Sequence, residues 1–237
     1  MHLKTIIMDS GKYPTHESYP FNLPIFQRTP FIKLSAPVTF FAGENGTGKS
    51  TLLQAIARKS RIHIWQDTER VHFETNPYED ALHRAIALEW TDGIVPGSFF
   101  SSDIFRYFSQ YLDEWAAAGP EILDYFGGKS LQAQSHGQSL MSFFKARYRV
   151  KGLYLLDEPE TALSPGSQIA LLRLLRDTAE KGHAQFIIAS HSPILLACPN
   201  AKILSFDHIP IREIPYEETN HFRVYRDFML DREKFLR

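Results

Sequence analysis

The most constraining feature of this chain is a short apolar run, VTFFA at Val38 to Ala42, that leads directly into the sequence GENGTGKST. The loop matches the pattern G-x-x-x-x-G-K-[ST], with Gly43, Gly48, Lys49 and Ser50 in the fixed positions. Glycines let backbone N–H groups wrap phosphates, the following helix N-terminus adds positive partial charge, and the lysine reaches the outer phosphates. The strand before the loop and the helix after it favour phosphate binding over a glycine-rich turn that only caps a helix.

The loop predicts a set of nucleotide-binding residues and part of a magnesium site. The nucleotide-binding residues are Gly43, Glu44, Asn45, Gly46, Thr47, Gly48, Lys49, Ser50 and Thr51. Lys49 is also expected to act in catalysis, because its charge reaches the phosphates that change during the reaction. The hydroxyl of Ser50 is expected to bind Mg²⁺, and that of Thr51 to reach an inner phosphate.

A second strand ends in a pair of acids, in the sequence GLYLLDEPE. This order places Asp157 and Glu158 at the carboxyl edge of the sheet, where open α/β folds bind ligands. Asp157 can then hold the Mg²⁺ shell and Glu158 can polarise the attacking water of a phosphoryl transfer. The alternative is an acidic pair that only ends a strand and solvates the turn. Pro159 supports a strand end, since it has no N–H to continue a ladder.

Alternating strands and helices predict an α/β fold with a mostly parallel central sheet flanked by helices. Strands are expected at Thr5 to Met8, Phe31 to Leu34, Val38 to Ala42, Leu153 to Leu156, Phe186 to Ala189 and Lys202 to Phe206. Helices are expected to start at Asn76-Pro77 and at Ser164-Pro165, where a capping side chain precedes a proline.

The region between the phosphate loop and the acidic strand is expected to be a helical lobe inserted in the sheet. Helical periodicity covers Tyr78 to Trp90 and Asp103 to Ala118. We therefore expect a single domain over residues 1–237, with a sheet core at about 1–75 and 150–237 and the lobe at about 76–149. The lobe contains no long heptad array, which argues against a protruding coiled coil.

Composition limits the partners and the compartment. With 26 basic and 27 acidic residues, the net charge of −1 gives no overall attraction to nucleic acid or to anionic membranes, so binding to nucleic acid would need a local patch. The single cysteine, Cys198, excludes an internal disulfide framework and suits a reducing compartment, so the cytoplasm is expected. No apolar run approaches the length of a membrane span, and the N-terminus lacks a signal-peptide core.

The segment QSHGQ at 134–138 stands shortly before the acidic strand, and there the chain resembles the ABC-type ATPase superfamily of P-loop NTPases. Ser135, Gly137 and Gln138 match that family's LSGGQ-like signature, and the other two positions depart from it. The resemblance implies that this segment opens a helix and contacts the γ-phosphate bound by a second subunit. It therefore implies an enzyme that hydrolyses ATP with Mg²⁺ and an ATP-dependent homodimer.

Further segments agree with the family in order and spacing. The sequence TALSP at 161–165 is similar to the D-loop, although Ser164 replaces its usual acid, and His191 in IIASHSP resembles the switch histidine, a catalytic position. A Q-loop glutamine has no clear match; Asp103 is the best substitute as a ligand near Mg²⁺ or water, ahead of Gln66. Within the superfamily, the chain most resembles small free-standing prokaryotic AAA-labelled ATPases related to the recombination and chromosome-maintenance branch. The resemblance lies in the sequences GENGTGKSTLL, LDEPETALSP and SHSPILLA.

Other segments carry weaker expectations. An aromatic face ahead of the loop usually holds adenine in this superfamily, which points to Tyr13, Phe21 or Phe26, with core packing as the alternative. The stretch Asn220 to Arg237 has apolar residues at helical spacing and is expected to be a helix docked on the body, and only secondarily a partner-binding surface. The basic segment FFKARYRVKG is interpreted as the end of the signature helix rather than a nucleic-acid contact.

Three functions remain open at this point. The leading hypothesis is an ATP-driven dimerisation switch that acts on an unidentified protein partner. The first alternative is a DNA-repair or defence-system ATPase that works with a nuclease. The second alternative is the nucleotide-binding subunit of a membrane transporter, which the non-standard signature and the missing Q-loop glutamine disfavour.

Overall fold

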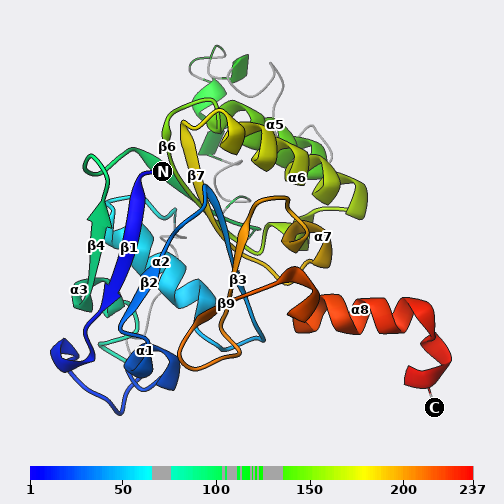
Figure 1. Cartoon of the computed structure of the whole chain (residues 1–237). Helices are drawn as coiled ribbons and strands as arrows, with labels where there is room; N and C mark the ends of the chain where they lie inside the picture. The colour runs from blue at the N-terminus through cyan, green and yellow to red at the C-terminus, as the bar shows by residue number, and fades with distance from the viewer. Residues whose placement is uncertain are drawn as a thin grey trace.

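The central sheet carries the phosphate loop and has the strand order β5-β6-β7-β3-β8-β9 (Figure 1). The computed structural model describes residues 1–65, 76–102, 105, 111–112, 114–117, 119, 121, 123–124 and 136–236. The strands are β3 (Val38–Ala42), β5 (Gly97–Ser101), β6 (Gly152–Asp157), β7 (Ala184–Ala189), β8 (Lys202–Ser205) and β9 (Arg212–Ile214). All neighbouring pairs are parallel except β8 and β9. This arrangement confirms the predicted α/β class with a mostly parallel sheet.

A second, antiparallel sheet covers one side of the molecule, with β1 (Leu3–Met8) between β2 (Phe31–Lys33) and β4 (Ile86–Trp90). The helix α2 (Lys49–Lys59) contacts β4 as well as the central strands β6 and β7, so it lies between the two sheets (Figure 1). Because α2 starts at the end of the phosphate loop, this packing fixes the loop between two rigid layers.

Alternate residues of the central strands belong to two separate hydrophobic clusters, one on each face of the sheet. On β3, Phe41 packs on the side of α2 and Phe40 packs on the opposite side, and both are fully buried. On β7, Ile187 and Ile188 divide in the same way. Successive side chains of a strand point to opposite faces, so a sheet covered on both faces needs apolar residues at every position.

Helices α5 (His136–Arg147), α6 (Pro165–Glu180) and α7 (Pro193–Leu196) cover the face opposite α2 (Figure 1). The predicted start of α6 is found, because the Oγ of Ser164 accepts a hydrogen bond of 3.3 Å from the Ser167 N–H. The short elements are η1 (Ser10–Lys12), α1 (Pro24–Arg28), α3 (Leu82–Ala85), η3 (Pro159–Ala162), η4 (Tyr216–Glu218) and η5 (Arg232–Phe235).

The range expected to be a helical lobe contains two strands, so the predicted helix over Tyr78 to Trp90 is wrong in its second half. There, β4 pairs with β1, and its burial alternates along the sequence IALEW. This alternation has the period of two of a strand rather than the period of 3.6 of a helix. The strand β5 pairs with β6 at the edge of the central sheet. Asn76 starts a turn rather than a helix, since its Oδ1 accepts from the Tyr78 N–H at 3.0 Å. The described residues between 102 and 117 are helical, as predicted.

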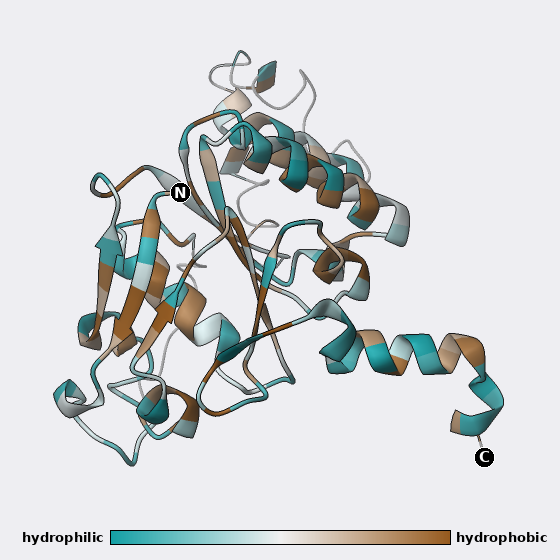
Figure 2. Ribbon diagram, in the orientation of Figure 1, coloured by the Kyte–Doolittle hydropathy of each residue, from teal (hydrophilic) through white to brown (hydrophobic). Residues whose placement is uncertain are grey.

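The C-terminal helix α8 (Asn220–Leu230) is present but is not packed along the body as expected. It projects away from the sheets in Figure 1, and no residue of α8 is buried among the described residues. Met229 and Leu230 are 80% and 79% exposed, and the hydropathy colouring shows apolar residues along the free helix (Figure 2). The amphipathic pattern predicted the helix correctly, but it did not specify whether the body or another surface covers its apolar residues. No described helix is long and apolar enough to cross a membrane.

Candidate nucleotide-binding site

The phosphate loop turns directly from the carboxyl end of β3 into the first turn of α2. Gly48 is the N-cap of α2 and has a φ of 97°, and Gly46 has a φ of 78°. Both values lie in the left-handed region that costs little only for glycine. A Cβ on Gly48 would lie 2.8 Å from Cζ of Phe26, so this glycine is also required for space. The loop is therefore a cradle of backbone groups at a helix N-terminus, which fits a phosphate chain.

The side chain of Lys49 lies within this loop and not in solvent. It is only 4% exposed, and its Nζ donates to the carbonyl oxygens of Gly43 and Glu44, both at 2.7 Å. Burial lowers the pKa of this ammonium group, and the nearby carboxylates, Glu158 first, act in the opposite direction. An ammonium group held at the loop by carbonyl oxygens is placed to meet phosphate oxygens.

Ser50 and Asp157 meet where a magnesium ion would be held. The Ser50 Oγ donates to Oδ1 of Asp157 at 2.8 Å, so the loop and the acidic strand come together as the sequence predicted. Burial raises the pKa of Asp157 to about 6, with the Ser50 hydrogen bond as the main opposing influence. No described cluster of three His, Cys, Asp or Glu could hold a metal by itself. One hydroxyl and one carboxylate fit Mg²⁺, which takes its other ligands from phosphates and water.

Glu158 directly follows the buried strand β6 and has an unusual backbone conformation. Its φ is 44° and its ψ is 55°, a left-handed conformation that is disfavoured for a residue with a Cβ. Strain of this kind is found at functional sites, where the surrounding structure enforces it. The backbone N–H of Glu158 donates to the Ala189 carbonyl at 2.9 Å, which ties the turn to the end of β7.

The carboxylate of Glu158 faces His191, which follows the neighbouring strand β7. Oε1 of Glu158 lies 3.4 Å from Nε2 of His191, and the two side chains are 38% and 25% exposed. Burial and the charge of Lys49 lower the pKa of His191, while Glu158 acts in the opposite direction. A carboxylate and a half-buried histidine thus stand together at the same sheet edge as the Ser50 and Asp157 pair.

Two family profiles match parts of the chain that carry these residues. Residues 21–58, which include the phosphate loop, match the family described as "AAA domain". Residues 139–197, which include the acidic strand and His191, match the family described as "AAA domain, putative AbiEii toxin, Type IV TA system". Both matches support a P-loop NTPase of the ABC/AAA ATPase branch. Membership of this branch implies use of a nucleotide and of Mg²⁺.

The chain is also similar to several solved structures. "An inward-facing conformation of a putative metal-chelate type ABC transporter" is 20% identical, with 79% of this chain and 75% of that chain covered and a TM-score of 0.48. "SMC head domain from Thermotoga maritima" is 16% identical, with 91% and 99% covered and a TM-score of 0.45. No curated protein matches the chain.

Sequence reasoning about this NTPase missed Glu160, a positioning group in the turn after β6. One oxygen of its carboxylate accepts from the Ser190 Oγ at 3.0 Å and from the His191 N–H at 2.5 Å. Burial raises the pKa of Glu160, and these hydrogen bonds act in the opposite direction. The second glutamate of the sequence DEPE is visible as an acid close to the predicted pair, but the sequence does not show which segment it contacts. Glu160 therefore connects the acidic strand to the segment that carries His191.

Sequence reasoning also missed two residues that hold Glu44 of the loop. The carboxylate of Asp207, which follows β8, accepts from the Glu44 N–H at 2.8 Å. Asn220, the first residue of α8, donates from Nδ2 to Oε1 of Glu44 at 2.9 Å. Asp207 had the same signal as Asp157, an acid at a strand end, whereas nothing in the sequence marks Asn220.

The aromatic residues that the sequence offered for adenine are core residues. Phe21 and Phe26 are fully buried and Tyr13 is 8% exposed, so their rings pack against each other and against the antiparallel sheet. Tyr19 instead reaches the loop, with its hydroxyl 2.5 Å from Oγ1 of Thr51. Tyr19 and Thr51 line a hollow of about 200 Å³ beside the first turns of α2.

Several predicted residues lie outside the described part of the chain: Ser135, Asp103 and Gln66. The other two signature residues, Gly137 and Gln138, lie in the first turn of α5, so the expectation that the segment opens a helix is met for these two. The Gly137 Cα faces α6, since a Cβ there would lie 3.3 Å from the Ser167 Oγ.

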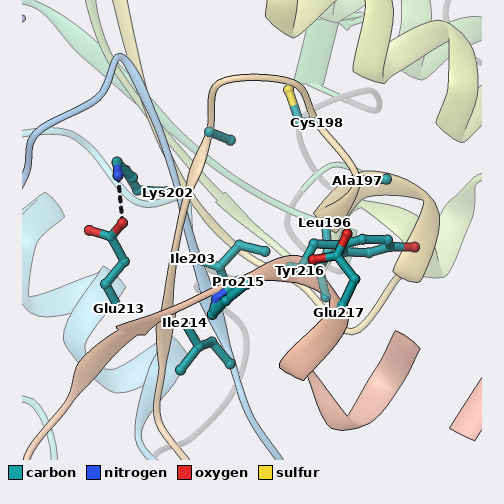
Figure 3. Close-up of a pocket in the computed structure, with 11 residues that line it drawn as sticks. Leu196, Ala197, Cys198, Lys202, Ile203, Glu213, Ile214, Pro215, Tyr216 and Glu217 are labelled. Carbon is teal, nitrogen blue, oxygen red and sulfur yellow. Dashed lines mark hydrogen bonds and ion pairs between the residues drawn. The ribbon is translucent and has the colours of Figure 1, made fainter. Parts of the chain in front are cut away.

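A larger hollow of about 540 Å³ lies away from the phosphate loop (Figure 3). It is formed by α7, β8, β9 and η4, and the ion pair between Lys202 and Glu213, 2.5 Å long, lies at its edge. Its lining includes neither loop residues nor the acids after β6. Size therefore does not identify the nucleotide site of this NTPase, whereas the chemistry of the side chains does.

Proposed function

We propose that this P-loop NTPase hydrolyses MgATP and acts as an ATP-driven dimerisation switch for a protein partner. One observation carries the proposal: the Glu158 and His191 pair stands beside the Ser50 and Asp157 pair at the carboxyl edge of one sheet. Phosphoryl transfer needs positioning and charge stabilisation more than covalent chemistry, and this arrangement supplies both.

The residues divide the reaction between them. The loop glycines and Lys49 bind the phosphates, and Ser50 and Asp157 would hold Mg²⁺, which would neutralise charge on the phosphate oxygens. Glu158 orients a water molecule and accepts its proton while the water oxygen bonds to the γ-phosphorus. The bond from that phosphorus to the bridging oxygen breaks, and ADP and phosphate leave. His191, which lies 3.4 Å from Glu158, stabilises the γ-phosphate.

The position of α5 supports a second subunit in the closed site. The phosphate loop leads into α2 on one face of the central sheet, whereas α5, with Gly137 and Gln138 in its first turn, packs against α6 on the opposite face. A signature segment that contacts the γ-phosphate would therefore come from a second copy of the chain. In this proposal ATP bridges two subunits and hydrolysis separates them.

The test is the solution mass of Glu158→Gln, measured by light scattering with and without MgATP. We expect a doubling of mass with MgATP, because the amide cannot accept the proton of water and the closed state persists. The matched control is Ser135→Arg in the same background, which should remain monomeric while still binding ATP. A monomer at saturating MgATP in Glu158→Gln would overturn the switch, and absence of phosphate release by the wild type would overturn the ATPase.

A second candidate is a defence-system ATPase that works with a nuclease. The observation that favours it is the family matched by residues 139–197, whose description names a toxin and a Type IV TA system. ATP turnover that rises with DNA and falls steeply with salt would favour this candidate. A rate of ATP turnover that does not change when DNA is added would favour the dimerisation switch that acts on a protein partner.

A further inference from the structure

His221, in the first turn of α8, faces His191 across the site. Nε2 of His221 lies 2.9 Å from Nδ1 of His191, and the ring planes are inclined at 66° with their centroids 5.0 Å apart. The second ring nitrogen of His191, Nε2, is the one that faces Glu158 at 3.4 Å. His191 therefore stands between Glu158 and His221: Nδ1 shares a hydrogen bond with His221, and Nε2 is buried near Glu158 without a hydrogen-bond partner among the described residues.

The contact between the two rings requires a definite placement of hydrogens. Two imidazole nitrogens at 2.9 Å share one hydrogen, so one ring donates and the other accepts. A carboxylate oxygen accepts hydrogen bonds, so Nε2 of His191 must carry a hydrogen for the contact with Glu158 to be favourable. In a neutral ring, Nδ1 of His191 then carries the lone pair, and Nε2–H of His221 must be the donor.

The environment favours neutral rings. Burial is the first cause that lowers the pKa of His191, followed by the charge of Lys49. Burial also lowers the pKa of His221, followed by the charge of His191. The reverse arrangement, with a hydrogen on Nδ1 of His191, would place the Nε2 lone pair against a carboxylate oxygen, which is repulsive.

We propose that His221 is a positioning residue that fixes the tautomer and orientation of His191, so that its Nε2–H points at Glu158 and the γ-phosphate. This inference rests on the proposed ATPase function. The first turn of α8 is held in place by its cap, because Thr219 is buried and accepts from the Phe222 N–H at 3.2 Å. The neighbouring Asn220 binds Glu44 of the phosphate loop, so the turn that carries His221 is tied to the loop.

The alternative is that the two rings only pack against each other. A packing role would be satisfied by any side chain of similar size, whereas a positioning role needs an N–H donor at the place of Nε2. The amide nitrogen of glutamine can occupy that place, and methionine fills a similar volume without a donor. The variants His221→Gln and His221→Met therefore distinguish a positioning role from a packing role.

The first measurement is the imidazole ¹⁵N spectrum of the full-length wild type, with the His191 signals assigned by their loss in His191→Gln. We expect His191 to have its hydrogen on Nε2 in the wild type and in His221→Gln, and a mixture of tautomers in His221→Met. This spectrum does not depend on ATP hydrolysis. A wild-type His191 with its hydrogen on Nδ1 would overturn the proposal.

The second measurement is the rate of phosphate release at saturating MgATP. We expect His221→Met to lower kcat about 10- to 100-fold, as is typical for loss of a partner that orients a site residue, and His221→Gln to restore most of it. The matched control is His183→Met, which removes a half-buried histidine whose ring contacts the Tyr148 carbonyl at 2.9 Å, outside the site.

The outcomes separate the two proposals. Equal kcat in the wild type and His221→Met, or equal loss in His221→Met and His221→Gln, would overturn the role of His221 while leaving the ATPase intact. A wild type without turnover would overturn the ATPase, and the ¹⁵N spectrum would still decide the tautomer. If His221→Met does not fold, the wild-type spectrum and His221→Gln keep the test complete.

Discussion

Replacing Asp157 by asparagine should make the metal-free protein more stable and abolish its use of MgATP. The carboxylate of Asp157 is half-buried beside Ser50, and this burial raises its pKa to about 6 from an ordinary 3.8. An ionised group that is less favourable in the folded protein than in the unfolded chain costs stability. Asparagine has the same shape, still accepts from the Ser50 hydroxyl, and carries no charge.

The pKa difference sets the size and the pH dependence of the effect. The difference between a pKa of 3.8 and one of about 6 corresponds to about 3 kcal/mol, an upper value for the gain in free energy of unfolding. Since the folded pKa is raised, the cost is present in full above pH 6 and disappears as the pH falls toward 4. At about 2–4 °C per kcal/mol for a chain of this length, the gain at pH 8 reaches about 6–12 °C in melting temperature.

The assay is urea unfolding at pH 8 and pH 5 in the presence of a chelator, with wild type and Asp157→Asn side by side. The matched control is Asp92→Asn, a change at an exposed carboxylate in a turn, which should alter stability by less than about 0.5 kcal/mol at either pH. MgADP at 100 times its dissociation constant should stabilise the wild type by about 2.7 kcal/mol and Asp157→Asn far less.

Two results would refute this reasoning. If Asp157→Asn is less stable than the wild type at pH 8, the carboxylate contributes more through its hydrogen bond than burial costs. If the gain is the same at pH 8 and pH 5, it does not arise from the charge of Asp157. Undiminished stabilisation of the variant by MgADP would show that this residue is not part of the metal site.

Three further predictions concern stability. Gly46→Ala should lower the free energy of unfolding by about 1–2 kcal/mol through left-handed backbone strain alone. Gly48→Ala should lower it by about 1–3 kcal/mol more, because its Cβ would also contact Phe26. Equal losses of the two variants in urea unfolding would contradict this. Glu160→Ala should cost about 1–3 kcal/mol, because the His191 N–H loses its acceptor, and should also lower phosphate release; an unchanged rate would show that Glu160 only supports the fold. Met229→Ser should change the free energy of unfolding very little, within about 0.5 kcal/mol, whereas a large drop would mean that α8 packs on the body.

The fold was largely predictable because its strands are covered on both faces. Buried parallel strands such as β3 and β7 are continuous apolar runs, and these stand out in a sequence. The strands that were missed lie at edges. In β4 burial alternates over only five positions, β5 contains glycine and two serines, and β9 has only three residues. Short edge strands are specified by the partner strand as much as by their own residues.

The residues of the candidate site likewise divide into those that the sequence predicts and those that it does not. The loop residues and Asp157 could be predicted because phosphate and Mg²⁺ demand particular residue types at fixed spacing. Glu160, Asp207 and His221 were missed because each acts on another residue, and several side chains could supply the same hydrogen bond. Their identity depends on which segments the fold brings together, and the spacing within one segment does not contain that information. The free position of α8 was unpredictable for the same reason.

The groups that cost the folded protein stability converge at one edge of the sheet. Asp157 has a half-buried carboxylate, Lys49 holds an ammonium group within the loop, and Glu158 has a left-handed backbone. Each of the two charged groups would gain a partner of opposite charge when phosphates and Mg²⁺ bind, so ligand binding should recover much of what burial costs. A chain that had no use for such a ligand would gain stability from neutral residues at both positions, and this is why the unfavourable placement supports a binding site rather than a structural one.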